Sequence, residues 1–325
     1  MISIVCPVYN EQQYITELLQ FCLMAQPEEK EIIFIDGHST DNTCQIIEQY
    51  CQQYSNIKLL YNPNKYVPHA LNIGIKAATG SIIIRLDAHT RYAPDYFEKI
   101  VSVFRHTNAD IVGGPMRIAH GNKVQKAIGY ATSTLFGIGN SSFHFETFEG
   151  FTNSVYLGAW KKEIFQITGL FDEAFVRNQD DEFNYRARQH GFTIYQSPSI
   201  KGYYHPRKRF RDLFSQYFQY GYYKPMVLSK IKSGIRLSHL VPSTFILYLL
   251  ALPLTTFFAG STALLPLVLY LLCNLYFSFS AKETFIQTLY VSAVYSLLHI
   301  AYGSGFIAGM LKPLTYKNKL TVLPQ

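Results

Sequence analysis

The sequence lacks the two glycine-rich stretches that most often bind nucleotide phosphates, G-x-G-x-x-G and G-x-x-x-x-G-K-[ST]. Their absence argues against a dinucleotide-binding turn and against a P-loop. The five cysteines form no C-x-x-C pair and no paired spacing with histidine, so the sequence predicts neither a zinc site nor a disulfide framework. We expect reduced thiols in a reducing compartment.

A secretory signal peptide is also missing from the sequence. The first residues, MISIVCPVYNE, have no basic start and reach an acidic residue at position 11. A signal peptide has a basic start followed by a longer apolar run. We therefore expect the N-terminal part to fold and act on the cytoplasmic side.

Charged residues are absent from two long stretches, 237–281 and 284–311, which only Lys282 and Glu283 separate. A membrane-spanning helix needs about 20 apolar residues. The first stretch could hold two helices with a break near Gly260 and Ser261, and the second could hold one more. We predict two or three transmembrane helices over 237–311 in a multi-pass protein of the cell membrane. A buried helical core is the alternative.

Basic residues gather just before the first uncharged stretch. Nine of them face a single acid, Asp212, in this segment: Lys201, Arg207, Lys208, Arg209, Arg211, Lys224, Lys230, Lys232 and Arg236. Such a flank is attracted to the anionic lipid of the cytoplasmic leaflet. Nucleic acid would also attract these charges, but it would not explain the uncharged stretches. We expect membrane lipid, and no nucleic acid, as the partner.

An amphipathic helix is predicted within the basic segment. Apolar or small residues recur at helical spacing at Phe210, Leu213, Phe214, Tyr217, Phe218 and Gly221. We expect an interfacial segment over 205–236 that lies along the membrane; packing on the N-terminal domain is the alternative. Three crossings would place the short basic tail, 312–325, outside, whereas two crossings or a re-entrant hairpin would keep it inside.

The first two hundred residues predict an α/β domain over 1–204. Short apolar runs at 2–6, 31–35, 57–61, 81–86 and 110–114 alternate with helical patterns. This order is typical of a mostly parallel sheet with helices on both faces. Such sheets bind ligands at the carboxyl ends of their strands. Polar residues follow three of these runs: Tyr9-Asn10-Glu11, Asp36-Gly37 and Asp87-Ala88-His89.

Two of these strand ends suggest ligand contacts. Residues i and i+2 of an extended chain point the same way, so Asp87 and His89 could hold one ion between them; a surface turn is the alternative. Asp36 could accept a hydrogen bond from a base or a ribose. Gly37 permits a tight turn after it, and residues 39–41 could cap the next helix.

Three carboxylates, Asp180, Asp181 and Glu182, stand at the start of a predicted helix, and Arg186 follows. The helix dipole favours acids at this end, so capping plus an arginine pair would explain the group. Crowded carboxylates also raise one another's pKa, which suits a general base. Both interpretations remain open from these residues alone.

Five motifs in this order resemble the family 2 glycosyltransferases with the GT-A fold: PVYNE, DGHSTDNT, LDAH, GLFDEAF and QDDEFNYR. The later stretch HPRKRFRDLFSQYFQYGYYKP, followed by the apolar runs, is similar to the subgroup of succinoglycan-type exopolysaccharide glucosyltransferases. The resemblance covers residues 2 to 230 closely and the apolar region loosely. It implies a GT-A nucleotide-sugar-binding sheet followed by C-terminal transmembrane helices.

The resemblance also implies roles for individual residues. The positions that match the family's nucleotide-sugar site are Pro7, Tyr9, Asn10, Glu11, Asp36, Gly37, Asp87, Ala88 and Arg186. The family's Asp-x-Asp metal motif is changed here, because His89 stands at its third position. Imidazole suits Mn²⁺ better than Mg²⁺, so we expect manganese as the divalent ion at Asp87 and His89. Asp180 matches the catalytic base, with Asp181 as the alternative, and Gln179 departs from the family's acidic residue.

A single base predicts one displacement with inversion at the anomeric carbon. The Gln-x-x-Arg-Trp motif of processive synthases is absent, since the only tryptophan is Trp160. We therefore expect one sugar to be added to a lipid-linked or growing glycan in cell-surface or exopolysaccharide synthesis, with UDP-sugars favoured as donors. Trp160 could stack on an acceptor sugar or pack a helix start. A nucleotidyltransferase and a non-catalytic membrane protein are the rival interpretations.

Overall fold

The computed structural model describes residues 1–119, 121–139, 142–230 and 237–311. The chain divides into two compact units. Unit 1 comprises Met1–Arg117 and Ser141–Tyr204, and unit 2 comprises Ile118–Asn140 and His205–Gln325. The predicted basic tail at 312–325 lies outside the described residues, as do Lys232 and Arg236 of the basic segment.

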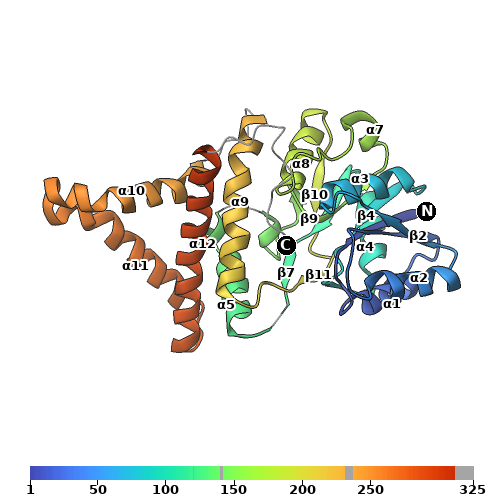
Figure 1. Ribbon diagram of the computed structural model, residues 1–325, viewed down its shortest axis with the longest axis horizontal. Coiled ribbons are helices and arrows are strands. Elements are labelled where there is room, and N and C mark those ends of the chain that lie inside the picture. The colour runs from blue at the N-terminus through green and yellow to red at the C-terminus, as the bar shows by residue number, and fades with distance from the viewer. Residues whose placement is uncertain (120, 140–141, 231–236, 312–325) are drawn as a thin grey trace. The chain divides into compact units, whose positions relative to one another are not determined.

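Unit 1 is built on a sheet that has eight strands within the described residues, in the order β3-β2-β1-β4-β9-β6-β10-β8 (Figure 1). Its strands are β1 (Ile2–Val8), β2 (Lys30–Asp36), β3 (Ile57–Tyr61), β4 (Ile82–Arg85), β6 (Ile111–Gly114), β8 (Gly150–Phe151), β9 (Tyr156–Lys161) and β10 (Ile194–Gln196). The pairs β1–β2, β2–β3, β1–β4 and β6–β10 are parallel. The five predicted strands are all present.

Strand β9 was not predicted, and it runs antiparallel between β4 and β6. Its sequence, YLGAWK, is interrupted by a glycine, so it shows no continuous apolar run. A smaller sheet has the order β5-β11-β7, with β5 (Thr90–Tyr92), β11 (Gly202–Tyr204) and β7 (Met116–Ile118).

Helices cover both faces of the large sheet, as predicted. They are α1 (Ile15–Met24), α2 (Thr43–Gln53), α3 (Val67–Ala77), α4 (Tyr96–Thr107), α7 (Ile164–Thr168) and α8 (Gln179–Gln189), with a short 3₁₀ helix at Ser142–His144. Ile4 of β1 belongs to a core cluster with Leu19 of α1 and Phe97 of α4. The next residue, Val5, belongs to the opposite cluster with Leu71 of α3 and Phe183 of α8. Successive side chains of one strand thus pack into the cores on opposite faces of the sheet.

Trp160 lies inside the second of these clusters. Only 3% of it is exposed, and its ring packs against Phe165, Phe171 and Phe183. The suggested stacking on an acceptor sugar is therefore wrong, because no sugar could reach the ring. Trp160 packs the core from strand β9 and does not stand at a helix start.

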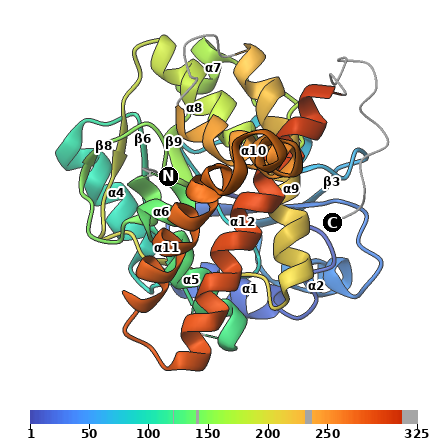
Figure 2. The same ribbon diagram turned by 90° about the vertical axis from the view of Figure 1, so that its left-hand side faces the viewer.

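Unit 2 consists of helices (Figure 2). They are α5 (Lys123–Thr132), α6 (Leu135–Ile138), α9 (Phe210–Lys230), α10 (Leu237–Ala259), the 3₁₀ helix η2 (Gly260–Leu264), α11 (Leu265–Phe279) and α12 (Phe285–Leu311). The predicted break falls at Gly260, whose φ is +63°. Two stretches of described residues are long and apolar enough to cross a membrane, His239–Phe279 and Phe285–Leu311.

The segment Ile118–Asn140 differs from the prediction. We expected it within a continuous domain over 1–204, but it belongs to unit 2. The reason is the apolar face of α5, where Ala127, Ile128 and Ala131 pack into a cluster with Val294 of α12. The predicted boundary after residue 204 coincides with the division between the units.

Candidate active site

The loops after β1 and β2 are locked together at the carboxyl edge of the sheet. Val8 at the end of β1 pairs with Asp36 at the end of β2. The backbone N–H of Asn10 donates to Ser39 Oγ at 2.9 Å, and Asn10 Oδ1 accepts from the backbone N–H of Thr40 at 2.8 Å. Glu11 N–H donates to Thr43 Oγ1 at 2.9 Å. The motifs PVYNE and DGHSTDNT therefore form one structural element.

Asp36 organises the turn that follows it. It is 2% exposed, and its carboxylate accepts the backbone N–H groups of His38, at 2.9 Å, and Ser39, at 3.0 Å. The left-handed residue of this turn is His38, with φ at +67°. A Cβ at Gly37 would make a tight contact, 3.3 Å from the carbonyl oxygen of Lys65, which favours a small residue there. The contact of Asp36 with a base remains a prediction.

Arg85 is a site residue that the sequence interpretation missed. It ends strand β4 and is 8% exposed. Its Nε donates to Asp87 Oδ1 at 3.2 Å, and its Nη1 lies 3.0 Å from both carboxylate oxygens of Asp180. A signal was available, because a buried charge within the apolar run SIIIRL needs a charged partner. Arg85 joins two predicted site residues that are 93 positions apart in the sequence.

Asp87 and His89 lie in a turn rather than on an extended strand. Strand β4 ends at Arg85, and the N–H of Thr90 donates to the carbonyl of Asp87. The alternation that was expected to align Asp87 with His89 therefore does not apply to them. Asp87 is instead joined to Arg85 by a side-chain hydrogen bond. Ala88 between the two predicted ligands is 5% exposed.

His89 contacts Glu11 from the first loop. Its Nδ1 lies 3.1 Å from Glu11 Oε1, and 42% of the histidine side chain is exposed. When Nδ1 carries the proton of this hydrogen bond, the imidazole has the tautomer that ligates a metal through Nε2. Glu11 thus suits the role of orienting His89.

The metal role of Asp87 and His89 remains a prediction. The described residues contain no group of three or more His, Cys, Asp or Glu side chains that could hold a metal. Asp87 Oδ1 accepts from Arg85, and no donor among the described residues reaches its Oδ2. Hard divalent ions are often held by one or two protein ligands together with substrate phosphates. Asp87 and His89 would need ligands of this kind from the substrate.

Helix α8 supplies the acidic cluster. Asp180, Asp181 and Glu182 stand in its first turn, as predicted. Glu182 is buried and pairs with Arg186, whose Nη2 is 2.8 Å from Glu182 Oε2. Arg186 also donates to the backbone carbonyls of Thr168, Gly169 and Leu170. These contacts tie α8 to the end of α7, and the predicted contact of Arg186 with the donor remains a prediction.

The environment of Asp180 raises the pKa of its carboxyl. Removal from water is the largest cause, Arg85 opposes it, and repulsion from Asp87 and Asp181 adds to it. Because 43% of the side chain is still exposed, solvent screening moderates the increase. A carboxylate with a raised pKa that remains open to solvent suits proton abstraction.

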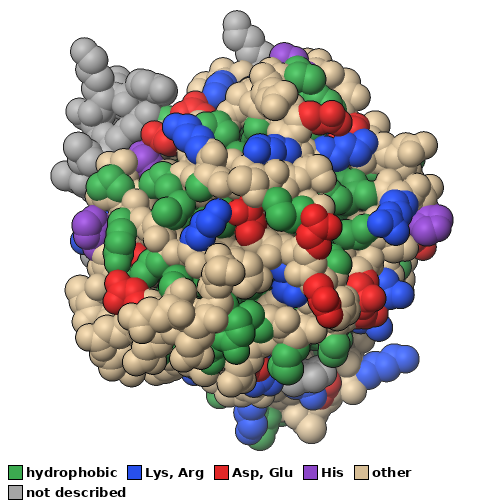
Figure 3. All heavy atoms as spheres, turned by 90° about the vertical axis from the view of Figure 1, so that its right-hand side faces the viewer, with side chains coloured by type: hydrophobic (Ala, Val, Ile, Leu, Met, Phe, Trp, Pro, Cys, Tyr) green, Lys and Arg blue, Asp and Glu red, His purple; other side chains and the backbone are tan. Residues whose placement is uncertain are grey.

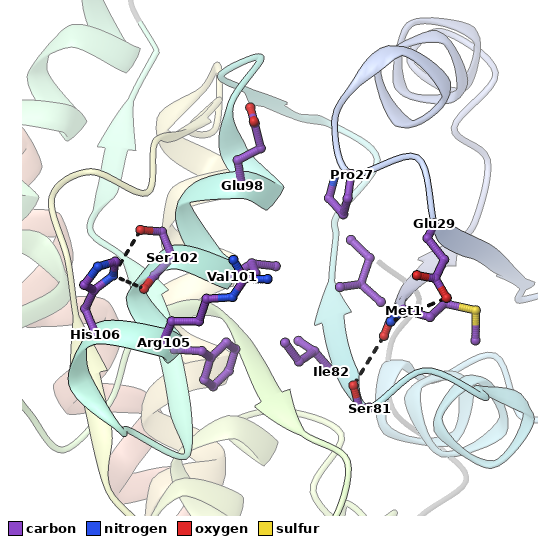
Figure 4. A pocket seen from close by; sticks show the side chains of 12 residues that line it. Met1, Pro27, Glu29, Ser81, Ile82, Glu98, Val101, Ser102, Arg105 and His106 are labelled. Atoms are coloured by element: carbon purple, nitrogen blue, oxygen red, sulfur yellow. Dashed lines mark hydrogen bonds and ion pairs between the residues drawn. The ribbon is translucent and has the colours of Figure 1, made fainter.

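A separate hollow of about 620 Å³ opens at the other end of the sheet (Figure 4). It is lined by Met1, Ile2 and Ser81 at the amino ends of β1 and β4, and by Ser102 and His106 of α4. The predicted site residues lie at the carboxyl ends of these strands. The hollow is therefore not part of the candidate active site.

Several known proteins resemble this chain along most of its length. It is 28% identical over 321 residues to a dolichyl N-acetyl-α-D-glucosaminyl phosphate 3-β-D-2,3-diacetamido-2,3-dideoxy-β-D-glucuronosyltransferase of Methanococcus voltae, covering 96% of this chain and 97% of that protein. It is 30% identical over 221 residues to the succinoglycan biosynthesis protein ExoA of Rhizobium meliloti, covering 67% of each chain.

Solved structures show the same fold. The mannosyltransferase PcManGT from Pyrobaculum calidifontis, in complex with GDP-Man and Mn²⁺, superposes with a TM-score of 0.58 at 17% identity, covering 97% of this chain and 87% of that one. TarS of S. aureus in complex with UDP-GlcNAc gives 0.51 at 15% identity, with 95% and 91% covered. The predicted GT-A fold is confirmed. Residues 3–165 match the protein family described as "Glycosyl transferase family 2". The chain is therefore a member of glycosyl transferase family 2 and an enzyme.

Proposed function

We propose that this enzyme transfers one sugar from a nucleoside diphosphate sugar to a lipid-linked glycan acceptor at the membrane, with inversion at the anomeric carbon. The observation that carries the proposal is the position of Arg85 between Asp87 and Asp180. The guanidinium of Arg85 binds Asp87, which would act at the donor's diphosphate, and Asp180, which would accept the acceptor's proton. The donor and the acceptor would therefore meet close to Arg85.

Asp180 is the general base of this proposal. Its carboxylate accepts the proton of the acceptor hydroxyl as the oxygen attacks the anomeric carbon and the bond to the diphosphate breaks. No second carboxylate is assigned as a nucleophile, so a single displacement follows. Asp181, in the same turn of α8, is the alternative base.

The loops that carry Tyr9, Asn10 and Asp36 form the nucleotide side of the site. Their mutual hydrogen bonds hold the loops in place before the donor arrives, which lowers the entropy cost of binding. Asp87 and His89 would hold a divalent ion, Mn²⁺ in preference to Mg²⁺, and this ion would offset the charge of the leaving diphosphate. PcManGT and TarS, whose structures contain GDP-Man with Mn²⁺ and UDP-GlcNAc, support a nucleotide-sugar donor.

The relatives support the class of acceptor. The Methanococcus voltae enzyme is named for a dolichyl phosphate-linked sugar, and ExoA is named for succinoglycan synthesis. We propose a lipid-linked acceptor in cell-surface or exopolysaccharide synthesis, with addition of a single sugar. The apolar helices of unit 2 would attach the enzyme to the cell membrane, with unit 1 on the cytoplasmic side.

A panel of UDP- and GDP-sugars tests the proposal. The full chain in detergent is incubated with each donor and with lipid extract, with and without Mn²⁺, and both released nucleotide and labelled lipid are measured. We expect labelled lipid from one donor, only when the metal is present. Nucleotide release without labelled product under every condition would contradict the lipid-linked acceptor. Absence of both would favour a non-catalytic protein.

A further inference from the structure

We propose that α10, η2 and α11 form a hairpin that enters the bilayer and leaves it on the same side, while α9 and α12 lie along the membrane surface. The apolar side chains of the hairpin would contact the acyl chains of the lipid. The inference rests on the membrane attachment in the proposed function and adds its topology. In this topology no helix crosses the bilayer completely, and the hairpin is inserted from one side.

The hairpin exposes apolar side chains all round. Its legs and turn carry no Asp, Glu, Lys or Arg from residue 237 to residue 281. Phe257 is 81% exposed, Phe258 is 77% exposed and Leu250 is 72% exposed. Among the 18 most apolar consecutive residues of His239–Phe279 none is buried, whereas 44% of the 18 most apolar consecutive residues of α12 are buried. A helix that is apolar on every side needs an apolar solvent.

An exposed face of the chain away from the hairpin has a different character. On the face shown in Figure 3, acidic and basic side chains are interspersed with apolar ones. Such mixed surfaces are typical of proteins in water. The uncharged hairpin differs from this face, as expected for a segment that contacts lipid.

Both legs of the hairpin return to one helix, α12. Near the start of α10, the carbonyl of Pro242 lies so close to Gly303 that a Cβ on this glycine would be 2.4 Å from its oxygen. Near the end of α11, Asn274 Nδ2 donates to the carbonyl of Ser292 at 3.2 Å and to Ser296 Oγ at 3.1 Å. The turn at Gly260 has no atom within 4 Å of an added Cβ. The two legs and α12 thus form a triangle with a free apex (Figure 1).

The companion of α12 explains why α12 itself does not cross. Helices α9 and α12 run side by side in the same direction, since Phe210 stacks on Tyr290 and the carbonyl of Tyr222 lies against Gly309 (Figure 2). A crossing by α12 would carry α9 with it.

Helix α9 carries charges along its length that hydrocarbon would not accept. They are Arg211, Asp212, Lys224 and Lys230. A charge at the bilayer centre is costly. The start of α12 adds an ion pair between Lys126 of α5 and Glu283, with Nζ and Oε2 2.9 Å apart. Both helices therefore suit the interface, as the sequence predicted for α9.

The length of the second leg agrees with a turn inside the bilayer. Helix α11 has 15 residues, which at 1.5 Å per residue span roughly 22 Å. The hydrocarbon core is about 30 Å thick. Helix α10, with 23 residues, is longer than the core is thick, but both legs share one apex, so the shorter leg limits its depth and α10 would have to tilt.

Single cysteines test the topology. The five native cysteines are free, and they are first replaced in the full chain; sugar transfer and the thermal unfolding midpoint check that this parent is folded. Ser229→Cys, Thr262→Cys, Lys282→Cys and Met310→Cys are then introduced one at a time. Sealed membrane vesicles of each orientation are treated with a membrane-impermeant maleimide, and then again after detergent.

We expect positions 229, 282 and 310 to be labelled from the same side, and position 262 to be labelled from neither side until detergent is added. Labelling of position 262 from the opposite side would show two crossings and overturn the inference. Labelling of positions 282 and 310 from opposite sides would show that α12 crosses, with the same consequence. Labelling of position 262 from the same side as 282 would place the apex in water and also overturn it. Sugar transfer is measured separately in detergent, so a failure of the proposed function is distinguishable from a failure of the topology.

Discussion

Arg85 and Asp180 form a two-pronged ion pair, in which both carboxylate oxygens lie 3.0 Å from the same guanidinium nitrogen. The guanidinium also binds Asp87, so it fixes the proposed base, Asp180, relative to the residue predicted to hold the metal. Arg85 stays charged, because Asp87 and Asp180 raise its pKa against the effect of burial. One buried side chain thus sets the separation of Asp87 and Asp180.

Replacement of Arg85 by methionine should lower kcat by about 10²-fold, since misplaced catalytic groups cost rates of this order. Arg85→Lys should recover part of the loss, because it keeps the charge but has one nitrogen where the guanidinium uses Nε for Asp87 and Nη1 for Asp180. Arg85 lowers the pKa of Asp180, and the base works deprotonated. The acidic limb of the kcat profile should therefore move to higher pH in Arg85→Met. An unchanged limb with reduced kcat would assign Arg85 a structural role only.

Asp180→Asn should keep the affinity for the donor while kcat falls by roughly 10²- to 10⁴-fold, because the proton acceptor is lost. Titration with the nucleoside diphosphate measures binding, and labelled lipid measures turnover. Asp181→Asn is the matched control in the same helical turn and should stay near the parent rate. The reverse result would move the role of base to Asp181.

Removal of divalent ions with EDTA should abolish transfer, and Mn²⁺ should restore it more efficiently than Mg²⁺. His89→Asp replaces the imidazole by a harder carboxylate and should shift the preference toward Mg²⁺. The ratio of rates with the two ions is the measurement. Full activity in EDTA would refute the metal role of Asp87 and His89.

Glu31 should make the stability of unit 1 dependent on pH. Burial disfavours its charge, but hydrogen bonds from Ser3, Thr79 and Lys58 outweigh burial and lower the pKa of Glu31 from 4.5 to about 2. The resulting stability is present above pH 4.5 and is lost as the pH falls toward 2. Glu31→Gln should lower the free energy of unfolding by about 3 kcal/mol at neutral pH.

Thermal unfolding midpoints of Glu31→Gln and the parent, measured in detergent between neutral and acidic pH, check this expectation. The two midpoints should converge as the pH falls. Glu29→Gln is the control, because the side chain of Glu29 is 80% exposed. A constant difference between Glu31→Gln and the parent at every pH would contradict the assigned cause.

Gly305→Ala should destabilise unit 2, although alanine favours a helix by about 1 kcal/mol over glycine. A Cβ at position 305 would lie 2.1 Å from the carbonyl oxygen of Phe218, so α9 and α12 would have to separate. Ala293→Leu adds bulk at an exposed position of the same helix and serves as the control. A higher unfolding midpoint for Gly305→Ala than for the parent would show that the two helices are not in close contact.

The sequence was sufficient where signals are local and insufficient where they depend on distant partners. Apolar runs predicted the strands, and the polar residues at the ends of β1 and β2 lie together at one edge of the sheet. Arg85 was missed because its partner Asp180 comes 95 positions later. The position of α5 was missed because its apolar face predicts that it packs against another element but does not identify that element as α12. The alignment of Asp87 with His89 was expected from a strand that in fact ends two residues earlier.

The assignment of Ile118–Asn140 to unit 2 limits how such a chain can be shortened or recombined. The backbone passes between the units three times, after residues 117, 140 and 204. A truncation after residue 204 would leave α5 with the catalytic part and remove the helix that covers Ala127, Ile128 and Ala131. Such a fragment would expose an apolar surface and tend to aggregate. Exchange of the C-terminal helices between relatives should therefore succeed only when the internal segment is exchanged with them.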